Sequence, residues 1–446
     1  MAFIAAAGKL AKEFTAPPVI EKSPLVEELD MFELPDGSQQ LWKPDLTQFE
    51  HDVPHTASTK ADKRGLYTHQ NKSYVALEGK QYQVQHQSEN TYRLKHPSRP
   101  DAYSPLITSN GQGAWIHEIE EIDTWATTTF VRRLDTSLQG LSDEQALSLL
   151  KASGTEESAV RQSFIDQKAP PALLDDCVQR LKARLELKRF IAQMRAGDTT
   201  ADPLLQLTVM THHEMWTPKK NLRCIDSSGK VIMEYGPVTE GKTPVIQVLD
   251  SQVREGQLLK TVLMSLSNAE IESLIGTDPV TGTVVLDLNE QATLLSSRIA
   301  DHAQHLQENV LDAVYAQSQE SEDLWVKKLK EAHPTLPLSA ANEIISTANT
   351  SEIVQLEAGR IALRLQEEAR LLEEENRLMR AYEGFYFDYR TSPDAHKLIL
   401  HSLADMPGWP TDFRLEVHDL KLSGTLLDQV GAPDASIRKV LVKQGD

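Results

Sequence analysis

The stretch that decides the fold is MWTPKKNLRCIDSSGKVIMEYG, residues 215–236, because a later part of the chain repeats its plan. Alternating apolar residues on both sides of a polar turn that contains glycine predict a β-hairpin. Trp216 and Asp226 are ten residues apart in this stretch, and Trp409 and Asp419 are also ten residues apart. The equal spacing predicts that the second tryptophan begins a second hairpin of the same kind.

Two glycines extend the match beyond the turn. Gly229 and Gly236 are seven residues apart, and so are Gly424 and Gly431. The turn between the two strands is two residues longer in the second stretch. We therefore predict that the tryptophan, the aspartate and the two glycines of each copy anchor a repeated structure.

A preceding helix and a third strand complete the unit. Apolar helical stretches, DPLLQLTVMTHHEM and DAHKLILHSLADMPG, lead into the two tryptophans, and the spacing places Val245 of PVIQVLD over Val440 of IRKVLVK. This pattern predicts a helix-plus-hairpin module of about 45 residues that occurs twice. The first module is expected at 204–276, and the second, truncated after its third strand, at 393–446.

Cys224 lies in the first hairpin and forms a Cys-x-Asp sequence with Asp226, a spacing found in some thiol-dependent ligases. Its counterpart in the second module is Val417, and Leu222 likewise aligns with Leu415. A nucleophilic thiol needs exposure and a nearby base or cation that lowers its pKa. Because the second module fills the same position with valine, we predict that Cys224 is a core side chain.

The rest of the chain divides around the two modules. Residues 1–65 are expected to form an N-terminal helix and a Pro-rich linker. Alternation in SYVALE, QYQVQH and TYRLKH predicts a three-stranded antiparallel meander within 66–135, closed by a Pro- and Gly-rich loop. Residues 136–203 and 277–392 have helical periodicity. The predicted fold class is therefore α+β: a small antiparallel meander, two repeated helix-plus-hairpin modules and intervening helical segments.

The composition limits the classes of partner. Lys and Arg number 46 against 65 Asp and Glu, which gives the 446-residue chain a net charge of −19. An acidic chain repels nucleic acid and anionic lipid, and no apolar stretch approaches the length of about eighteen residues that a membrane span needs. The first residues carry no charge ahead of a short apolar run, so we expect no cleavable signal peptide. We predict a protein partner, no nucleic acid, no membrane span and no cofactor.

Three polar clusters look like sites but fail the spacing test. Residues 211–214 contain adjacent histidines, and residues 117–121 contain one histidine followed by glutamates. Neither matches HExxH, in which two histidines four apart on a helix bind zinc. Residues 180–189 are basic, but the aromatic residues that accompany nucleic-acid binding are nearly absent, so we predict a solvated face paired with acidic neighbours. We expect no metal site and no catalytic residue in these clusters, and a core thiol at Cys177.

Six phrases of the sequence resemble one family. They are LWKPDLTQFEH, GLYTHQNKSYVALEGKQYQV, HPSRPDAYSPLITSNGQGAW, GRIALRLQEEARLLEEENRLMRAYEGFYFD, MPGWPTDFRLEV and IRKVLVKQGD. From about Leu41 to the end they are similar to large bacterial dermonecrotic-toxin-like proteins, many of which carry leucine-rich repeats and a C-terminal novel-E3-ligase ubiquitin ligase domain. The resemblance implies a segment of a secreted or injected effector, upstream of such repeats. It carries over no catalytic residue, because the ligase cysteine of these proteins lies in a helical domain that this chain lacks.

Three functions stay open at this point. The leading one is a non-catalytic scaffold or targeting region of a toxin or effector. The second is a segment of a host-directed E3 ubiquitin ligase whose catalytic domain lies downstream. The third is an enzyme with an unrecognised site, for which the polar loop from His96 to Glu121 is the candidate. Because no helix follows the third strand of the second module, we expect the chain to be a fragment of a longer polypeptide.

Overall fold

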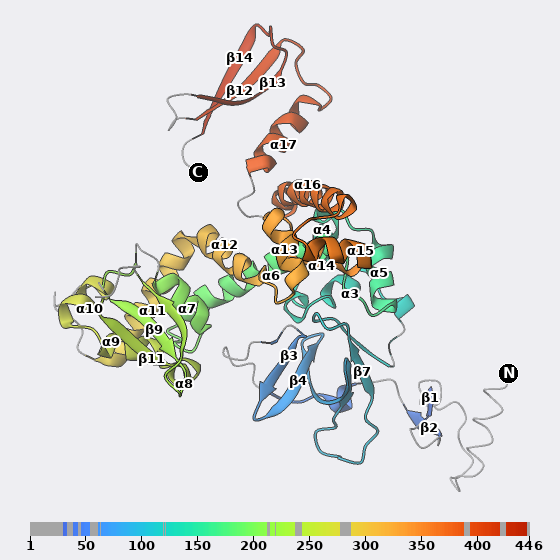
Figure 1. The fold of residues 1–446 in the computed structure, drawn as a ribbon, viewed down its shortest axis with the longest axis vertical. Helices are drawn as coiled ribbons and strands as arrows, with labels where there is room; N and C mark the ends of the chain where they lie inside the picture. The colour runs from blue at the N-terminus through green and yellow to red at the C-terminus, as the bar shows by residue number, and fades with distance from the viewer. Residues whose placement is uncertain are drawn as a thin grey trace, which may run out of the picture.

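The computed structural model describes most of the chain, namely residues 30–33, 39–42, 46–53, 61–62, 64–118, 120, 122–211, 215–218, 220–236, 243–276, 287–387, 393–419 and 425–443. The fold class is α+β, as predicted, with a six-stranded sheet and two three-stranded sheets. Figure 1 shows the six-stranded sheet on one side of a central group of helices and the two small sheets at different ends of the molecule. The predicted N-terminal helix and the prolines of the predicted linker lie outside the described residues.

The largest sheet is a meander in which every neighbouring pair of strands is antiparallel. Its strands are β3 (Leu66–His69), β4 (Lys72–Leu77), β5 (Lys80–Ser88), β6 (Thr91–Leu94), β7 (Leu106–Ser109) and β8 (Trp115–His117). The prediction of three strands is therefore wrong. The segment predicted as a closing loop contains β7 and β8, which are too short, and too close to Pro and Gly, to show alternation. The buried Trp115 fixes β8, since its Nε1 donates to the Arg64 carbonyl at 2.7 Å.

Residues 46–53, ahead of the meander, pack along it. A 3-10 turn, η1 (Thr47–Phe49), places Phe49 in the core of the meander, and the next residues run beside β5. This part of the predicted linker therefore lies against the sheet. Further upstream, strands β1 (Asp30–Glu33) and β2 (Gln39–Trp42) pair as an antiparallel hairpin.

A layer of helices lies next to the meander. It consists of η2 (Ile122–Thr124), α3 (Thr127–Arg132), η3 (Thr136–Leu138), α4 (Asp143–Ala152), α5 (Glu157–Ile165) and the 24-residue α6 (Ala172–Arg195). Ser142 and Gln145 form a capping box at the start of α4. Helix α6 is the axis of the helical part, because helices from both halves of the chain pack against it.

The remaining helices follow the first module. They are α8 (Asp250–Arg254), α9 (Leu258–Met264), α10 (Asn268–Ile275), α11 (Leu288–His305), α12 (Gln307–Ser318), α13 (Leu324–Ala332), α14 (Leu338–Ser346), α15 (Thr350–Glu357) and α16 (Leu363–Tyr386). Helices α8 to α11 enclose the first module, and its core includes residues of α6 as well. Helices α13 to α16 form a separate apolar cluster against the start of α6.

Both predicted modules have the same order of elements. The first has α7 (Pro203–Met210), β9 (Asn221–Ile225), β10 (Val231–Tyr235) and β11 (Val245–Leu249), and the second has α17 (Pro393–Ala404), β12 (Phe413–Asp419), β13 (Thr425–Gly431) and β14 (Ile437–Lys443). In each sheet the first strand is central, antiparallel to the second and parallel to the third. Two stretches with matched spacing therefore build the same three-stranded topology.

A β-bulge occurs at the same place in both hairpins. Ile232 is the unpaired residue of β10 and Leu427 is the unpaired residue of β13. These two positions coincide once the longer turn of the second module is allowed for. A bulge bends the strand and increases its twist, so both hairpins are shaped alike.

The third strand is paired with the central strand in different registers in the two modules, and the registers differ by two residues. Val245 lies opposite Asn221, whereas Val440 lies opposite Glu416, which is the counterpart of Arg223. The alignment of Val245 with Val440 by spacing is therefore wrong in register. A shift of two residues keeps every side chain on its face of the sheet, because strand side chains alternate with period two.

Candidate interaction surface

The anchors of the first module are buried and hydrogen-bonded. The Trp216 indole is buried, and its Nε1 donates to the Lys220 carbonyl at 2.8 Å. The Asp226 carboxylate organises the turn by accepting the backbone N–H groups of Ser228 and Lys230 at 2.8 and 2.9 Å. The hydrogen bond from the Ser228 hydroxyl is the main reason that the pKa of Asp226 lies below its usual value. These contacts fix the approach to β9 and the turn between β9 and β10.

The glycine at the end of each second strand makes a close approach to the first strand. Gly236 and Gly431 have φ angles of 126° and 95°. A Cβ on Gly236 would lie 2.6 Å from the Asn221 Oδ1, and one on Gly431 would overlap the Phe413 carbonyl oxygen. Gly229 has a φ of 83° in the turn, with open space around it. Glycine is therefore required at positions 236 and 431, because the second strand approaches the first too closely there for a Cβ.

The second tryptophan has different surroundings from the first. Trp409 is half-buried and packs edge-on against Phe413, with ring centroids 5.1 Å apart. Its Nε1 is buried without a hydrogen-bond partner among the described residues, in contrast to that of Trp216. Asp419 ends β12, but its side chain and Gly424 lie outside the described residues. The second module is thus held less tightly at its helix-to-strand corner.

Neither cysteine has the surroundings of a nucleophile. Cys224 is buried on β9, and burial, followed by the Asp250 carboxylate, raises the pKa of its thiol. Cys177 is fully enclosed on α6, and burial together with Glu383 raises the pKa of its thiol well above the usual value. A thiol with a raised pKa stays protonated and reacts poorly. Both cysteines act as small core side chains.

The polar loop from His96 to Glu121 uses its histidines structurally. Nδ1 of His96 accepts two backbone N–H groups of the residues that follow it. His117 lies 3.4 Å from Glu120, which also pairs with the buried Arg133. Burial, and then the Arg133 charge, lower the pKa of His117 to about 3, so its imidazole is a weak base. Glu121 lies outside the described residues.

The basic residues of α6 are matched by carboxylates. Three of them make ion pairs: Arg180 with Asp176 and Glu383, Lys182 with Asp135, and Arg184 with Glu308. The predicted pairing with acidic neighbours is confirmed for these three residues. The predicted solvation is wrong for Arg180, which is buried and joins α6 to α16. A cation enclosed by two carboxylates has no charge left for a phosphate backbone.

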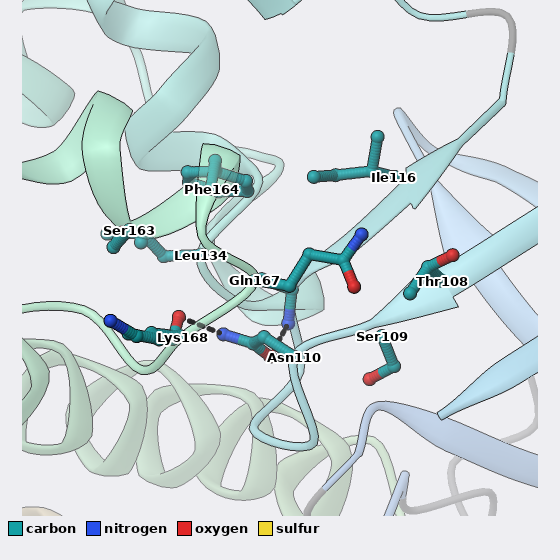
Figure 2. A pocket seen from close by; sticks show the side chains of 10 residues that line it. Thr108, Ser109, Asn110, Ile116, Leu134, Ser163, Phe164, Gln167 and Lys168 are labelled. Atoms are coloured by element: carbon teal, nitrogen blue, oxygen red, sulfur yellow. Dashed lines mark hydrogen bonds between the residues drawn. The ribbon is translucent and has the colours of Figure 1, made fainter. Parts of the chain in front are cut away.

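The cavity drawn in Figure 2 is too small for a ligand. It lies between β7 and α5, where the Asn110 amide donates to the Lys168 carbonyl at 3.4 Å. Its volume is about 10 Å³, close to the space of a single water molecule.

A larger cleft of about 550 Å³ lies beside α6 and α7. Its lining includes six carboxylates: Asp62, Asp135, Asp175, Asp176, Glu186 and Asp202. Burial raises the pKa of Asp175 to about 6. Two of the other carboxylates are neutralised by Lys182 and Arg180, and no described residue that lines the cleft is a histidine or cysteine. Apart from Lys182, the titratable side chains that line the cleft are therefore all carboxylates.

Two further kinds of site were tested on the described part of the chain. None of its helices is both long and apolar enough to cross a membrane. No group of three or more histidine, cysteine or acidic side chains in the same residues is placed to hold a metal ion. His212 and His213 lie outside the described residues.

The exposed apolar side chains are concentrated in the last part of the chain. Fifteen of the twenty-five large hydrophobic residues that are exposed among the described residues lie between 363 and 442. They follow α16, α17, β13 and β14: Leu363, Leu371, Leu378, Tyr382, Phe385, Tyr386, Ile399, Leu403, Met406, Leu426, Leu427, Ile437, Val440, Leu441 and Val442. Clustered exposed apolar residues are typical of surfaces that contact another protein. We call this set the C-terminal surface.

The same strand is enclosed in one module and open in the other. Ile246 and Val248 of β11 are 3 % and 0 % exposed, because α8 and α9 pack against β11 and α11 packs on α9. Ile437 and Leu441 of β14 are 49 % and 51 % exposed. The described residues of the second module include α17 over β13 but no helix that takes the place of α9. Figure 1 shows this sheet at the far end of the molecule, with only α17 between it and α16.

Comparison with known proteins adds no relative: no protein-family model, curated protein or solved structure matches this chain. The C-terminal surface was missed in the sequence. The signal that could have revealed it is the heptad spacing of Leu371, Leu378 and Phe385 in a helix whose other positions are largely charged.

Proposed function

We propose that this chain is a non-catalytic protein-binding segment of a large bacterial toxin or effector that is secreted or injected into a host or target cell. The observation that supports the binding role is the C-terminal surface, which gathers most of the exposed apolar side chains on two helices and one small sheet. The setting in a toxin or effector rests on the six sequence phrases quoted above. A segment of a host-directed ubiquitin ligase, with its catalytic domain elsewhere, would use the surface in the same way.

Cross-linking with matched variants tests this role. The full chain, the double variant Ile437→Ser with Leu441→Ser, and the control Leu294→Ser on α11 would be cross-linked in host-cell extract, and the linked residues mapped by mass spectrometry. All three aliphatic side chains are at least two-fifths exposed, so none of the changes leaves a cavity. We expect partners to be linked through residues 363–442, and to be lost in the double variant alone. Partners linked equally in all three proteins would contradict the proposal.

A further inference from the structure

We propose that the C-terminal surface binds a second copy of this chain, with the exposed stripe of α16 from one copy seated on β14 of the other. This inference rests on the proposed function, because it names the partner of the same surface. It is supported by the internal repeat, by the charges of the two surfaces and by their lengths.

The first module shows what kind of element completes this sheet. Helix α9 contacts β11 and buries Leu258, Leu259, Val262 and Leu263 against the core that contains Ile246 and Val248. Strand β14 has the same position in the second sheet, parallel to the central strand. The element that would complete the second sheet is therefore a helix with an aliphatic stripe. It would lie on β14 beside α17, because α9 lies on β11 in the core that also contains α7.

The face of β14 that would receive this helix carries the cation of Lys439. Ile437, Lys439 and Leu441 point to one face, because they pair with Phe413, Leu415 and Val417 of β12. Arg438 points to the other face, where it pairs with Glu416 at hydrogen-bonding distance. The described residues give Lys439 no ion pair. The face thus presents an ammonium group between two exposed aliphatic side chains and favours a partner with a carboxylate.

Helix α16 presents the complementary pattern. Leu371, Leu378, Tyr382 and Phe385 are spaced by seven, four and three residues, which places them on one side of the helix, and all four are exposed. Glu375 lies on this side as well, four residues after Leu371 and three before Leu378.

Glu375 is also the carboxylate that is left over on this helix. Its neighbours Glu367 and Glu374 are paired with Arg370, and Glu368 is paired with Arg364. No ion pair to Glu375 occurs among the described residues. One copy therefore offers a carboxylate without a described ion pair inside an apolar stripe, and the other offers an ammonium group without a described ion pair inside an aliphatic strand face.

The two surfaces have similar lengths. From Leu371 to Phe385 the helix rises about 21 Å, at 1.5 Å per residue, and from Ile437 to Lys443 the strand spans about 20 Å, at roughly 3.3 Å per residue. A contact of this length and about 10 Å in width buries roughly 400 Å² in total. Two reciprocal contacts about a twofold axis bury roughly 800 Å², which is the size of a weak and reversible interface.

The test is a charge swap followed by sedimentation. Wild-type chain would be studied by analytical ultracentrifugation from about 1 to 300 µM, with Lys439→Glu, Glu375→Lys, the double swap and the control Lys397→Glu, which changes the same charge on exposed α17. We expect wild type and control to dimerise with dissociation constants of tens of micromolar, the size expected for a small interface. Each single swap should weaken dimerisation at least tenfold, and the double swap should restore it to within about threefold. Failure of the double swap to restore binding would overturn the assignment of the two surfaces.

A monomeric wild type up to 300 µM would overturn self-association itself. Binding of a fluorescent peptide of residues 363–387 to the chain would then be measured. This measurement separates failure of self-association from failure of the proposed function. If the peptide binds the monomeric chain and Lys439→Glu weakens it, the second copy is the wrong occupant, but the surface still binds an acidic helix. If the peptide does not bind either, the pairing of α16 with β14 is overturned, and the protein-binding role is decided by the cross-linking experiment alone.

Discussion

The two modules share strand order, strand direction and the position of the bulge, yet they differ in what surrounds them. The first module lies inside the largest apolar core of the chain, which includes residues of α6, α7, α9 and α11. Among its described residues the second has Ala395, Leu400 and Val430 as buried apolar side chains, and it leaves both faces of β14 exposed. The comparison teaches that a repeated backbone plan sets the local fold of each copy, whereas the later helices decide which copy is enclosed. The predictions below test this difference.

The largest expected difference lies between the two tryptophans. Trp216→Ala should lower the free energy of unfolding of the first module by about 3–5 kcal/mol, because it removes a buried indole and leaves a cavity. Trp409→Ala should cost about 1–2 kcal/mol, since that side chain is half-buried and its Nε1 has no described partner. Hydrogen exchange at the amides of β9 and β12 measures each module separately. Equal losses would mean that the second tryptophan is buried by something else.

Substitution of Gly431 at the end of β13 should give the next largest loss of stability. Gly431→Ala places a Cβ on the Phe413 carbonyl at a positive φ, so we expect a loss of about 2–4 kcal/mol in the second module. Gly229→Ala is the matched control, because it has a similar φ with no neighbouring atom and should cost only about 1 kcal/mol. Exchange rates of the β12 and β9 amides report the two losses. If Gly229→Ala costs as much as Gly431→Ala, close approach between the strands is not the reason for the glycine.

The acidic cleft beside α7 should make the free energy of unfolding depend on pH. The folded pKa of Asp175 is raised to about 6 from an ordinary value of 3.8, so the native state holds a proton that the unfolded chain has already lost. The cost of ionising this carboxyl in the folded protein is therefore full above about pH 6 and disappears as the pH falls towards 4. Asp175→Asn should raise the free energy of unfolding by about 2 kcal/mol at pH 7.5 and change it little at pH 4.

Urea unfolding at both pH values measures this effect, with Asp312→Asn on the exposed side of α12 as the control. The control should change stability by less than about 0.5 kcal/mol at either pH. The amides of β12 in the second module should not respond to Asp175→Asn. A gain that is the same at pH 4 and 7.5 would show that the cleft does not hold the proton.

The smallest change in stability is expected when the side chains at positions 224 and 417 are exchanged between the modules. Cys224→Val and Val417→Cys should each change stability by less than about 1 kcal/mol, because the two side chains have similar volume and Cys224 is packed as an apolar residue. Cys224→Ala should cost more, at about 1–2 kcal/mol, because it removes volume from the core. Thermal unfolding of the three variants gives this ranking. A selective loss of the partners found by cross-linking in Cys224→Val, with stability unchanged, would bring back a chemical role for the thiol.

Spacing alone was enough to predict the fold class and the repeated unit. The separation from tryptophan to aspartate and that between the two glycines are the same in both copies. The second glycine is held in place by a local close approach, that of Gly236 to Asn221 and of Gly431 to Phe413. The register of the third strand could not be predicted in this way. It is set by pairing with a distant strand, and a shift of two residues leaves the apolar pattern of β14 unchanged.

The C-terminal surface could not be predicted for a related reason. Alternation in β14 marks a strand, but the pattern is the same whether or not a helix lies on that strand. The heptad spacing in α16 likewise predicts an apolar stripe without stating which neighbour it meets. Strands β7 and β8 were missed because the contact that fixes them, from Trp115 to the Arg64 carbonyl, joins residues 51 apart in sequence.

The buried ion pair between Arg180 and Glu383 has a consequence for synthesis of the chain on the ribosome. The two residues are 203 positions apart, so α6 emerges long before its partner on α16. At about 5–20 residues per second, the guanidinium waits roughly 10–40 s for that carboxylate. During this interval Asp176 is the acidic neighbour already translated on the same helix, and water or a chaperone must solvate the rest of the charge. Early vectorial folding can therefore complete the meander, whereas closure of the central helical layer depends on the last third of translation.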